Sequence, residues 1–370
     1  MSSRLFPPAQ LGGLLVKNRI VVSPMCQYSA VDGLPQPWHH QHLGALALSG
    51  AGLVIVEASG VEPEGRISPQ CTGLWNDAQE AAWKTLLDGI RTYSSTPIGI
   101  QLAHAGRKGS TRSIAHASPG PLTAEEGAWT TFGPSAVPFS DWPAPQALDR
   151  AGLDRIKTAF ADSARRADRA GFECVDLHAG HGYLLHEFCS PLSNTREDDY
   201  GGSLDNRLRF PLEVAAVVRE AWPADKALGA RITGSDWAPG GFTPGDAVVF
   251  ATRLRDLGYD FVDVTSGGLV HDAKIPGAEP GYQLDFARRV KEAVEGLQVM
   301  AVGMLVTPAQ AEGAVRLGDA DFVMVARAML DDPRWGWRAA EALGEPFQGP
   351  PQYARAAEKA WPGHKFAHPK

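Results

Sequence analysis

Three side chains suited to binding and protonating a polar substrate occur within six residues of one another. They are His178, His181 and Tyr183, in the stretch His-Ala-Gly-His-Gly-Tyr. Paired imidazoles can hydrogen-bond a carbonyl or nitro oxygen and stabilise the negative charge that develops there during a reaction. A tyrosine hydroxyl two residues further on can donate a proton to the same substrate. The cluster therefore predicts an oxyanion-binding pair with a neighbouring proton donor.

Metal binding is the alternative interpretation of the two histidines. A zinc site needs at least three protein ligands, and the chain offers no further ligand at a matching position. The four cysteines, Cys26, Cys71, Cys174 and Cys189, are scattered without CxxC spacing, so neither a disulfide framework nor a metal cluster is indicated. We expect no metal site. A metal-dependent hydrolase or lyase stays open as an alternative function, and it predicts a colourless protein that a chelator inactivates.

Two residues near the end of the chain are suited to binding a phosphate group. Gly303 and Arg327 each follow a short apolar run. Glycine exposes backbone N–H groups, and a guanidinium binds a phosphate dianion through paired hydrogen bonds. Because no GxGxxG or Walker-type loop follows a strand elsewhere, the pattern favours a tightly held mononucleotide over a separate dinucleotide-binding domain.

The elements that must position these residues are short apolar runs bounded by turn residues, which recur eight times. Their interiors are rich in Val, Ile and Leu without alternation, as in parallel strands buried on both faces. The runs are Ile20–Met25, Leu53–Ala58, Ile98–Ala103, Glu173–His178, Leu228–Thr233, Phe261–Ser266, Val299–Met304 and Phe322–Arg327. Helical segments are expected at Gln41–Ser49, Ala78–Thr92, Leu153–Ala170, Leu204–Trp222, Pro244–Leu257, Asp285–Glu295, Pro308–Leu317 and Pro333–Leu343. Eight strand–helix units predict an α/β fold, a single (β/α)8 TIM barrel over residues 1–370, with 344–370 as a C-terminal tail.

In such a barrel the carboxyl ends of all strands meet at one mouth, where the active sites of these folds lie. Polar residues or glycine stand at the ends of nearly all the predicted strands. Two long connections, 103–152 and 179–202, leave from the same face, where barrels carry substrate loops. Trp129 and Trp142 in the first of them are expected either to line the site or to anchor the loop. The long loops and the strand ends together predict one site at the mouth.

Composition excludes several classes of protein. The chain is 44% hydrophobic and 21% charged with a net charge of −7, which is ordinary globular composition and argues against nucleic-acid or anionic-lipid partners. The opening residues lack the layout of a secretory signal, and no run approaches the roughly 18 apolar residues of a membrane span. We therefore expect a cytoplasmic protein with a small-molecule substrate and no nucleic-acid or membrane partner.

Five motifs together resemble the old yellow enzyme family. They are Ser23-Pro-Met-Cys-Gln-Tyr28, Gln101-Leu-Ala-His-Ala-Gly-Arg-Lys108, His178-Ala-Gly-His-Gly-Tyr-Leu-Leu-His186, Ser190-Pro-Leu-Ser-Asn194 and Tyr200-Gly-Gly-Ser-Leu-Asp-Asn-Arg207. Their order and spacing are similar across essentially the whole chain, and Cys26 with Tyr28 resembles the thermophilic-like branch. The resemblance implies FMN across the barrel mouth, reduced by NADPH or NADH, that passes hydride to the C=C bond of an α,β-unsaturated carbonyl or nitro compound by a ping-pong cycle.

The same resemblance implies which residues bind the cofactor. Those expected to contact FMN are Ser23, Pro24, Met25, Cys26, Ala58, Gln101, His178, Arg231, Gly303, Ala326 and Arg327. Arg231 corresponds to the cation beside ring atoms N1 and O2, where it favours the reduced flavin. Gly303 and Arg327 correspond to the phosphate site, where Ala326 replaces a glycine that many relatives have. Cys26 corresponds to a thiol that tunes the flavin, as a polarizable weak donor can.

On the substrate side, the resemblance implies that His178 and His181 bind the substrate oxygen and that Tyr183 is the proton donor. Tyr28 corresponds to a substrate-pocket tyrosine. Arg355 lies in a C-terminal motif whose arginine reaches a neighbouring subunit's site, which implies a homodimer or homotetramer. Lys108 is a candidate to attract the nicotinamide phosphate. A flavin-binding redox sensor with Cys26 as its switch is a further alternative, and it predicts bound FMN without alkene turnover.

Overall fold

Eight parallel strands close into a barrel in the computed structural model, which describes residues 2–113, 120–276, 279–347, 349–356 and 359–367. The strands are β3 (Ile20–Val22), β4 (Leu53–Gly60), β5 (Ile98–Ala103), β8 (Cys174–Ala179), β9 (Ala227–Thr233), β10 (Phe261–Thr265), β11 (Gln298–Ala301) and β12 (Phe322–Val325). Each strand pairs with its successor, and β12 pairs with β3 to close the ring. The predicted TIM barrel is confirmed.

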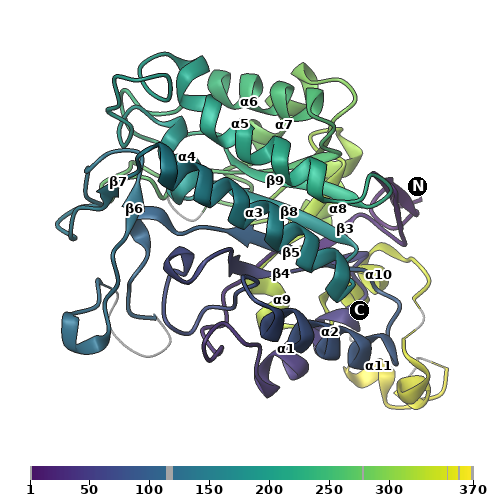
Figure 1. The fold of residues 1–370 in the computed structure, drawn as a ribbon. Helices are drawn as coiled ribbons and strands as arrows, with labels where there is room; N and C mark the ends of the chain where they lie inside the picture. Colours follow the sequence, from purple (N-terminus) through teal and green to yellow (C-terminus); the bar gives the residue numbers. More distant parts are fainter. Residues whose placement is uncertain (1, 114–119, 277–278, 348, 357–358, 368–370) are drawn as a thin grey trace.

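Helices surround the barrel on its outer side (Figure 1). They are α1 (Pro37–Ala47), α2 (Asp77–Arg91), α3 (Arg150–Ala170), α5 (Leu204–Ala221), α6 (Pro244–Asp256), α7 (Leu284–Ala293), α8 (Pro308–Arg316) and α10 (Trp335–Leu343). Thr243 and Thr307 cap α6 and α8 ahead of a first-turn proline, as their sequences predict. The predicted start of α10 at Pro333 is wrong: the helix begins at Trp335, after a turn in which the Asp332 side chain accepts from the Arg334 N–H at 2.9 Å.

A hairpin of β1 (Ala9–Leu11) and β2 (Leu14–Val16) closes the end of the barrel opposite the mouth. Its Leu11 and Val16 belong to one buried apolar cluster with Phe261, Phe322 and Met300 from the barrel strands. This cluster, called the apolar plug below, fills the end of the barrel opposite the mouth, so the polar interior residues lie nearer the mouth. Cys174 is part of the same cluster and packs as a small apolar side chain.

Both long connections contain more regular structure than their sequences suggest. The first carries the short helices η2 (Gly106–Lys108) and η3 (Ala124–Glu126) and a paired β6 (Phe132–Gly133) and β7 (Gln146–Ala147). The second carries the buried helix α4 (Leu184–Cys189), which ends at Cys189. The last predicted strand is too long, since Arg327 opens the short helix α9 (Arg327–Asp331).

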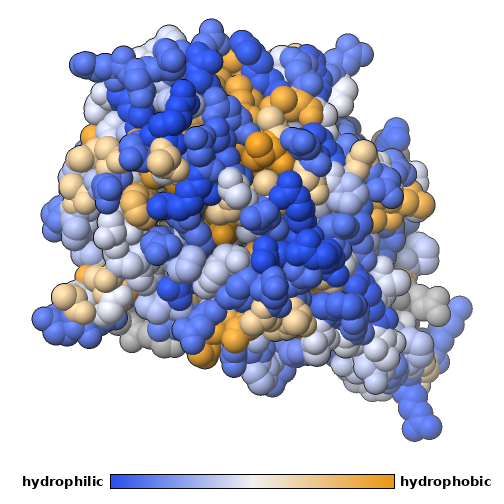
Figure 2. All heavy atoms as spheres, in the orientation of Figure 1, coloured by the Kyte–Doolittle hydropathy of each residue, from blue (hydrophilic) through white to orange (hydrophobic). Residues whose placement is uncertain are grey.

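The C-terminal tail contains η4 (Pro351–Ala356) and α11 (His364–Ala367). In Figure 1 the tail lies at the lower right, towards the chain's N-terminus, whereas β6 and β7 lie on the opposite side with the mouth loops. The face shown in Figure 2 is mostly hydrophilic, with apolar side chains in small groups. Within the described ranges, no helix has the length and apolar character needed to cross a membrane.

Candidate active site

A buried polar ring lies inside the barrel beneath the mouth. Gln101 on β5 donates a hydrogen bond of 2.7 Å to Asp176 on β8, its partner in the strand register. Arg231 on β9 pairs with Asp263 on β10 and donates to the Ser23 hydroxyl at 2.9 Å. All five side chains are almost inaccessible to solvent. The predicted cofactor residues Ser23, Gln101 and Arg231 are thus brought together.

The two carboxyl groups of this ring were not predicted. Asp176 and Asp263 each stand two residues before a residue of the mouth, and alternation along a strand puts both on the inner face of the barrel. Burial raises the pKa of Asp176 to about 7 and also raises the pKa of Asp263. One oxygen of each carboxyl lacks a hydrogen-bond partner among the described residues. The ring therefore has polar capacity left over for a ligand above it.

His178, His181 and Tyr183 form one cluster at the end of β8. The ring centroid of His178 lies 5.4 Å from that of His181 and 5.1 Å from that of Tyr183. Burial lowers the pKa of both histidines, with the nearby cations Arg231 and Lys108 acting in the same direction, so both rings are neutral near pH 7. Burial raises the pKa of Tyr183 and keeps its hydroxyl protonated. The cluster thus combines neutral imidazoles with a protonated phenol.

The turn that presents this cluster is held by Lys108. His181 and Gly182 both have positive φ, and a Cβ at Gly182 would lie 2.2 Å from the Gly268 carbonyl oxygen. The Lys108 ammonium donates to the carbonyl oxygens of His181 and Gly268 at 2.8 and 2.7 Å and lies 5.0 Å from the Tyr183 ring centroid. Burial lowers the pKa of Lys108 to about 8. Lys108 therefore clamps two mouth loops together, a contact that its sequence position did not indicate.

A chain of hydrogen bonds behind His181 restricts its tautomer. The Thr265 hydroxyl lies 2.8 Å from His181 Nε2 and 3.2 Å from Gln283 Oε1. Gln283 Oε1 already accepts from the Ser266 hydroxyl at 2.7 Å. A hydroxyl has one hydrogen, so when Thr265 donates it to Gln283 Oε1 the hydroxyl accepts from His181 Nε2–H, and when Thr265 donates it to Nε2 the ring carries its hydrogen on Nδ1. The Thr265 hydroxyl therefore couples the tautomer of His181 to Gln283. Thr265 and Gln283 are functional candidates that the sequence analysis missed.

The loop after β3 forms another wall of the mouth. Met25, Cys26 and Tyr28 are half-buried there, as predicted for residues that face a ligand, and Tyr28 adopts a positive φ of 51°. The Gln27 N–H donates to a Glu57 carboxyl oxygen at 3.0 Å, which ties this loop to β4 beside Ala58. Burial, followed by the nearby thiols of Cys26 and Cys71, raises the pKa of Tyr28. This wall is less polar than the ring beneath it.

The ends of β11 and β12 bring a glycine turn and an exposed arginine together. Gly303 has a φ of 109°, and a Cβ there would lie 2.4 Å from the Gln283 amide nitrogen, so only glycine is accommodated. Arg327 at the start of α9 is exposed, and within the described residues its guanidinium pairs with no carboxylate. Ala326 stands directly before this helix. A free cation beside a glycine turn is suited to a phosphate group.

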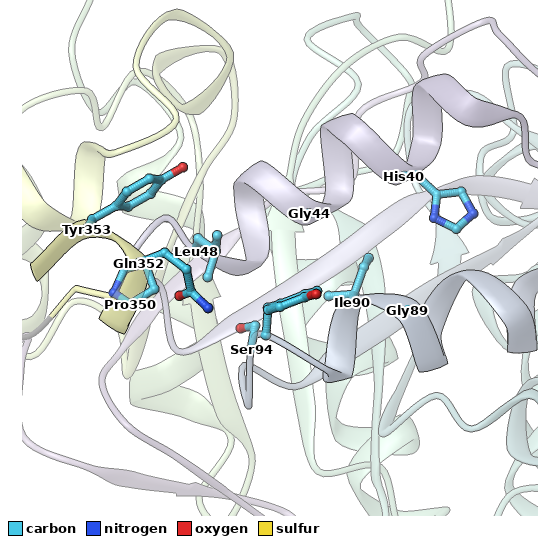
Figure 3. A pocket seen from close by; sticks show the side chains of 10 residues that line it. His40, Gly44, Leu48, Gly89, Ile90, Ser94, Pro350, Gln352 and Tyr353 are labelled. Atoms are coloured by element: carbon cyan, nitrogen blue, oxygen red, sulfur yellow. The ribbon is translucent and has the colours of Figure 1, made fainter.

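Three further predicted residues, Trp129, Trp142 and Arg355, lie outside the polar ring and the histidine–tyrosine cluster. Trp129 donates to the Glu64 carbonyl at 3.1 Å, which anchors its loop. Trp142 packs edge-on against Phe139, whose ring centroid lies 4.9 Å from the Lys108 ammonium, so its loop adjoins the mouth. Arg355 is exposed in η4, and neighbouring tail residues line a groove of about 330 Å3 against α1 and the end of α2 (Figure 3). In that view Gln352 and Pro350 of the tail face Leu48 at the end of α1. The structure therefore does not bring Arg355 to the mouth of its own barrel.

Comparison with known proteins assigns this geometry to a family. Residues 4–345 match the model of the NADH:flavin oxidoreductase / NADH oxidase family. The chain belongs to this family. It is 42% identical to the NADPH dehydrogenases of Geobacillus thermodenitrificans and Bacillus pumilus over 358 and 361 residues, covering 96% of this chain and 99% and 100% of those proteins. The resemblance to the old yellow enzymes is confirmed.

A solved structure of a morphinone reductase agrees with the assignment. It superposes with a TM-score of 0.78 at 26% identity, over 94% of this chain and 91% of the other. The chain is accordingly an FMN-dependent oxidoreductase with a reduced nicotinamide nucleotide as its hydride donor. The residues at the mouth suit FMN. The Gly303 turn and the Arg327 guanidinium, which pairs with no carboxylate among the described residues, offer partners for its phosphate. The unpaired polar atoms beneath the mouth offer partners for its ring.

Proposed function

We propose that this flavin oxidoreductase reduces activated C=C bonds with NADPH, in two half-reactions at the same mouth. Bound FMN would supply the hydride chemistry that links the nicotinamide to the alkene. The proposal of NADPH is supported by the relatives named NADPH dehydrogenase, and the proposal of a reductase by the neighbour named morphinone reductase. α,β-Unsaturated carbonyl and nitro compounds are the proposed substrates.

The observation that carries this proposal is the pairing of two neutral imidazoles with a protonated phenol. His178 and His181 donate hydrogen bonds to the carbonyl or nitro oxygen, which gains negative charge as hydride reaches the β-carbon. Tyr183 then donates its proton to the α-carbon. Since burial keeps all three groups in these protonation states, no ionisation has to precede the reaction near pH 7.

The remaining predicted residues hold the cofactor in this proposal. Arg231 keeps a cation beneath the ring, where reduction places negative charge, and Gln101 supplies an amide next to it. Arg327, Gly303 and Ala326 bind the phosphate. The side chains that line the ring are Ser23, Pro24, Met25, Cys26 and Ala58, and Tyr28 faces the substrate.

Replacement of Tyr183 by phenylalanine tests the proton-donor role. In stopped-flow absorbance, Tyr183→Phe should bleach with NADPH at the wild-type rate and reoxidise with an enone roughly 10²–10⁴ times more slowly, the usual cost of losing a positioned proton donor. Tyr259→Phe is a matched control, because its buried hydroxyl donates to the Ala215 carbonyl at 3.0 Å away from the mouth. An unchanged oxidative step in Tyr183→Phe removes this residue from the mechanism.

We also propose a homo-oligomer in which Arg355 completes the substrate site of a neighbouring copy. Two observations support it. The η4 segment that carries Arg355 packs near the end of α1, whereas the mouth lies at the start of that helix, where Trp38 donates to Gln27 at 3.1 Å. Tyr93 and Tyr353 beside the groove are 64% and 42% exposed, apolar surface that an adjoining chain can cover.

A further inference from the structure

The peptide unit between His181 and Gly182 is held at both of its polar groups. Lys108 donates to the His181 carbonyl oxygen at 2.8 Å, and the Gly182 N–H donates to Nδ1 of His186 at 2.8 Å. A peptide bond is planar, so fixing its oxygen and its N–H fixes the whole plane. Rotation of this plane would redirect the side chains on either side of it, which are His181 and Tyr183.

The other ring nitrogen of His186 lies against a buried carboxylate. His186 Nε2 lies 2.8 Å from Oδ1 of Asp236 in the loop after β9, although the two atoms are not aligned as a regular hydrogen bond and the contact is mainly electrostatic. Asp236 Oδ2 accepts from the Ser190 hydroxyl at 2.6 Å and from the Phe242 N–H at 2.7 Å. Burial opposes ionisation of Asp236, but the nearby His186 ring and these two donors outweigh burial and lower the pKa of Asp236.

These contacts determine which nitrogen of His186 carries the hydrogen. Nδ1 accepts from the Gly182 N–H, so it has a free lone pair and no hydrogen. The neutral ring therefore has its hydrogen on Nε2, the nitrogen beside the Asp236 carboxylate. The Thr233 hydroxyl lies 3.3 Å from Nδ1 and can donate to the same lone pair. Asp236 thus favours the tautomer of His186 that can hold the turn.

We propose that His186 and Asp236 are positioning residues that set the orientation of His181 relative to Tyr183. Both side chains are buried, and His186 acts on the mouth through the Gly182 N–H. The effect on substrate binding rests on the proposed function, in which His181 binds the substrate oxygen and Tyr183 donates the proton. The tautomer of His186 does not rest on it, since it depends only on the contacts with Gly182 and Asp236.

Asp236→Asn reverses this arrangement at nearly constant shape. The Phe242 N–H needs an oxygen opposite it, so the new amide nitrogen takes the position beside His186 Nε2. Two donors would then face each other, so the hydrogen of the His186 ring moves to Nδ1. Nδ1–H can donate to the Thr233 hydroxyl but no longer accepts from the Gly182 N–H. The turn at the mouth loses one hydrogen bond.

NMR of the holoenzyme labelled with 15N-histidine tests the tautomer. Two-bond 1H–15N spectra distinguish Nδ1–H from Nε2–H, and the signals of His186 are those that disappear in His186→Asn. We expect Nε2–H in the wild type and Nδ1–H in Asp236→Asn. A wild-type His186 ring with hydrogen on Nδ1, or a tautomer that Asp236→Asn leaves unchanged, would overturn the proposal.

Phenol binding, followed through the flavin absorption spectrum, tests the positioning role. Asp236→Asn and His186→Leu should bind phenol about tenfold more weakly than the wild type, the effect of one lost hydrogen bond. His186→Asn should keep most of the affinity, because its amide oxygen can replace Nδ1 as the acceptor. Equal losses in His186→Asn and His186→Leu would mean that His186 only fills space. If Asp236→Asn does not fold, the wild-type tautomer and the two His186 variants still decide.

Glu312→Gln is the matched control, because Glu312 is a buried carboxyl that accepts from the Ser3 hydroxyl and the Leu5 N–H near the start of the chain. It should lower the free energy of unfolding in urea without weakening phenol binding. Weaker phenol binding in Glu312→Gln as well would reduce the effect of Asp236→Asn to a loss of stability. A wild-type protein that neither binds phenol nor reduces an enone contradicts the proposed function, whereas the tautomer measurement still tests the His186–Asp236 pair.

Discussion

At the scale of single residues, burial determines protonation state at this site. A histidine exposed to water is partly charged near pH 7, and a charged imidazole has no lone pair with which to fix its orientation. Here the low pKa of His178 and His181 keeps the rings neutral, so which nitrogen carries the hydrogen is decided by their partners. For His181 that partner is the Thr265 hydroxyl.

Thr265→Val tests whether this hydroxyl orients His181. Valine keeps the shape but removes the hydroxyl that bonds Nε2, so the hydrogen of the His181 ring is no longer held on one nitrogen and the proposed hydrogen bond to the substrate oxygen weakens. Phenol binding, followed through the flavin absorption spectrum, should weaken about tenfold, the usual effect of losing one hydrogen bond worth roughly 1–2 kcal/mol. Thr85→Val, whose hydroxyl bonds the Ala81 carbonyl on the exposed face of α2, is the control. Equal affinities in both variants would exclude the tautomer role.

At the scale of elements, α4 connects the long mouth loops to the barrel. Glu187 on α4 accepts from the Arg107 N–H at 2.9 Å. The Arg107 guanidinium in turn donates to the carbonyl oxygens of Val137, Pro138 and Leu269 at 3.1, 3.2 and 2.7 Å. The short helix, the first long loop and the loop after β10 therefore share one buried polar junction, in which burial raises the pKa of Glu187 to about 8.

This junction predicts a pH effect on stability. A carboxyl whose pKa is higher in the folded than in the unfolded protein stabilises the fold when protonated, and this contribution is lost as pH rises from the unfolded value near 4.5 through about 8. Glu187→Gln keeps the accepting oxygen and removes the titration. Relative to wild type, its free energy of unfolding in urea should rise across this range by at most about 1.4 kcal/mol per pH unit. Exposed Glu220→Gln is the control, and parallel pH profiles for Glu187→Gln and wild type would contradict the assignment.

The elements that the sequence predicted well are those with a local signal. Each strand is an apolar run without alternating polar residues. The starts of α6 and α8 are marked by a capping threonine, Thr243 or Thr307, followed directly by proline. The β6–β7 pair and α4 had no such signal, because each is stabilised by distant contacts such as the Arg107 junction. Likewise Asp176 looked like an ordinary strand residue until the strand register placed it against Gln101.

The residues of the site likewise divide into those that have a local sequence signal and those that do not. Tyr183 and the two histidines were predicted because they are close in sequence, and Arg231 was predicted from the family resemblance. Thr265 and Gln283 matter through contacts between segments that no local pattern specifies, since Thr265 lies 84 positions after His181 in the sequence. Lys108 was noticed from its motif, yet its two carbonyl contacts depend on how the turns at 181 and 268 meet.

At the scale of the whole molecule, the apolar residues that stabilise the barrel and the polar residues of the candidate site lie towards opposite ends of the barrel axis. The apolar plug around Leu11 and Phe261 closes one end, and the polar ring opens towards the other. The tail leaves α10 on the plug side, with the Trp337 indole donating to the Leu48 carbonyl at 2.8 Å. A tail residue at that position can serve a substrate site only if the site belongs to another chain.

Hybrid dimers test whether Arg355 acts between chains. One chain carries Tyr183→Phe with Arg355 intact, and the other carries Arg355→Ala with Tyr183 intact, each with its own affinity tag. Neither homodimer has a complete site. In hybrids purified through both tags, the second chain's site keeps its own Tyr183 and receives Arg355 from its neighbour, so enone turnover should return to about half the wild-type rate per dimer. If Arg355 acts within its own chain, the hybrid has no complete site and shows no recovery of enone turnover. If the Arg355→Ala homodimer is fully active, Arg355 has no role in turnover.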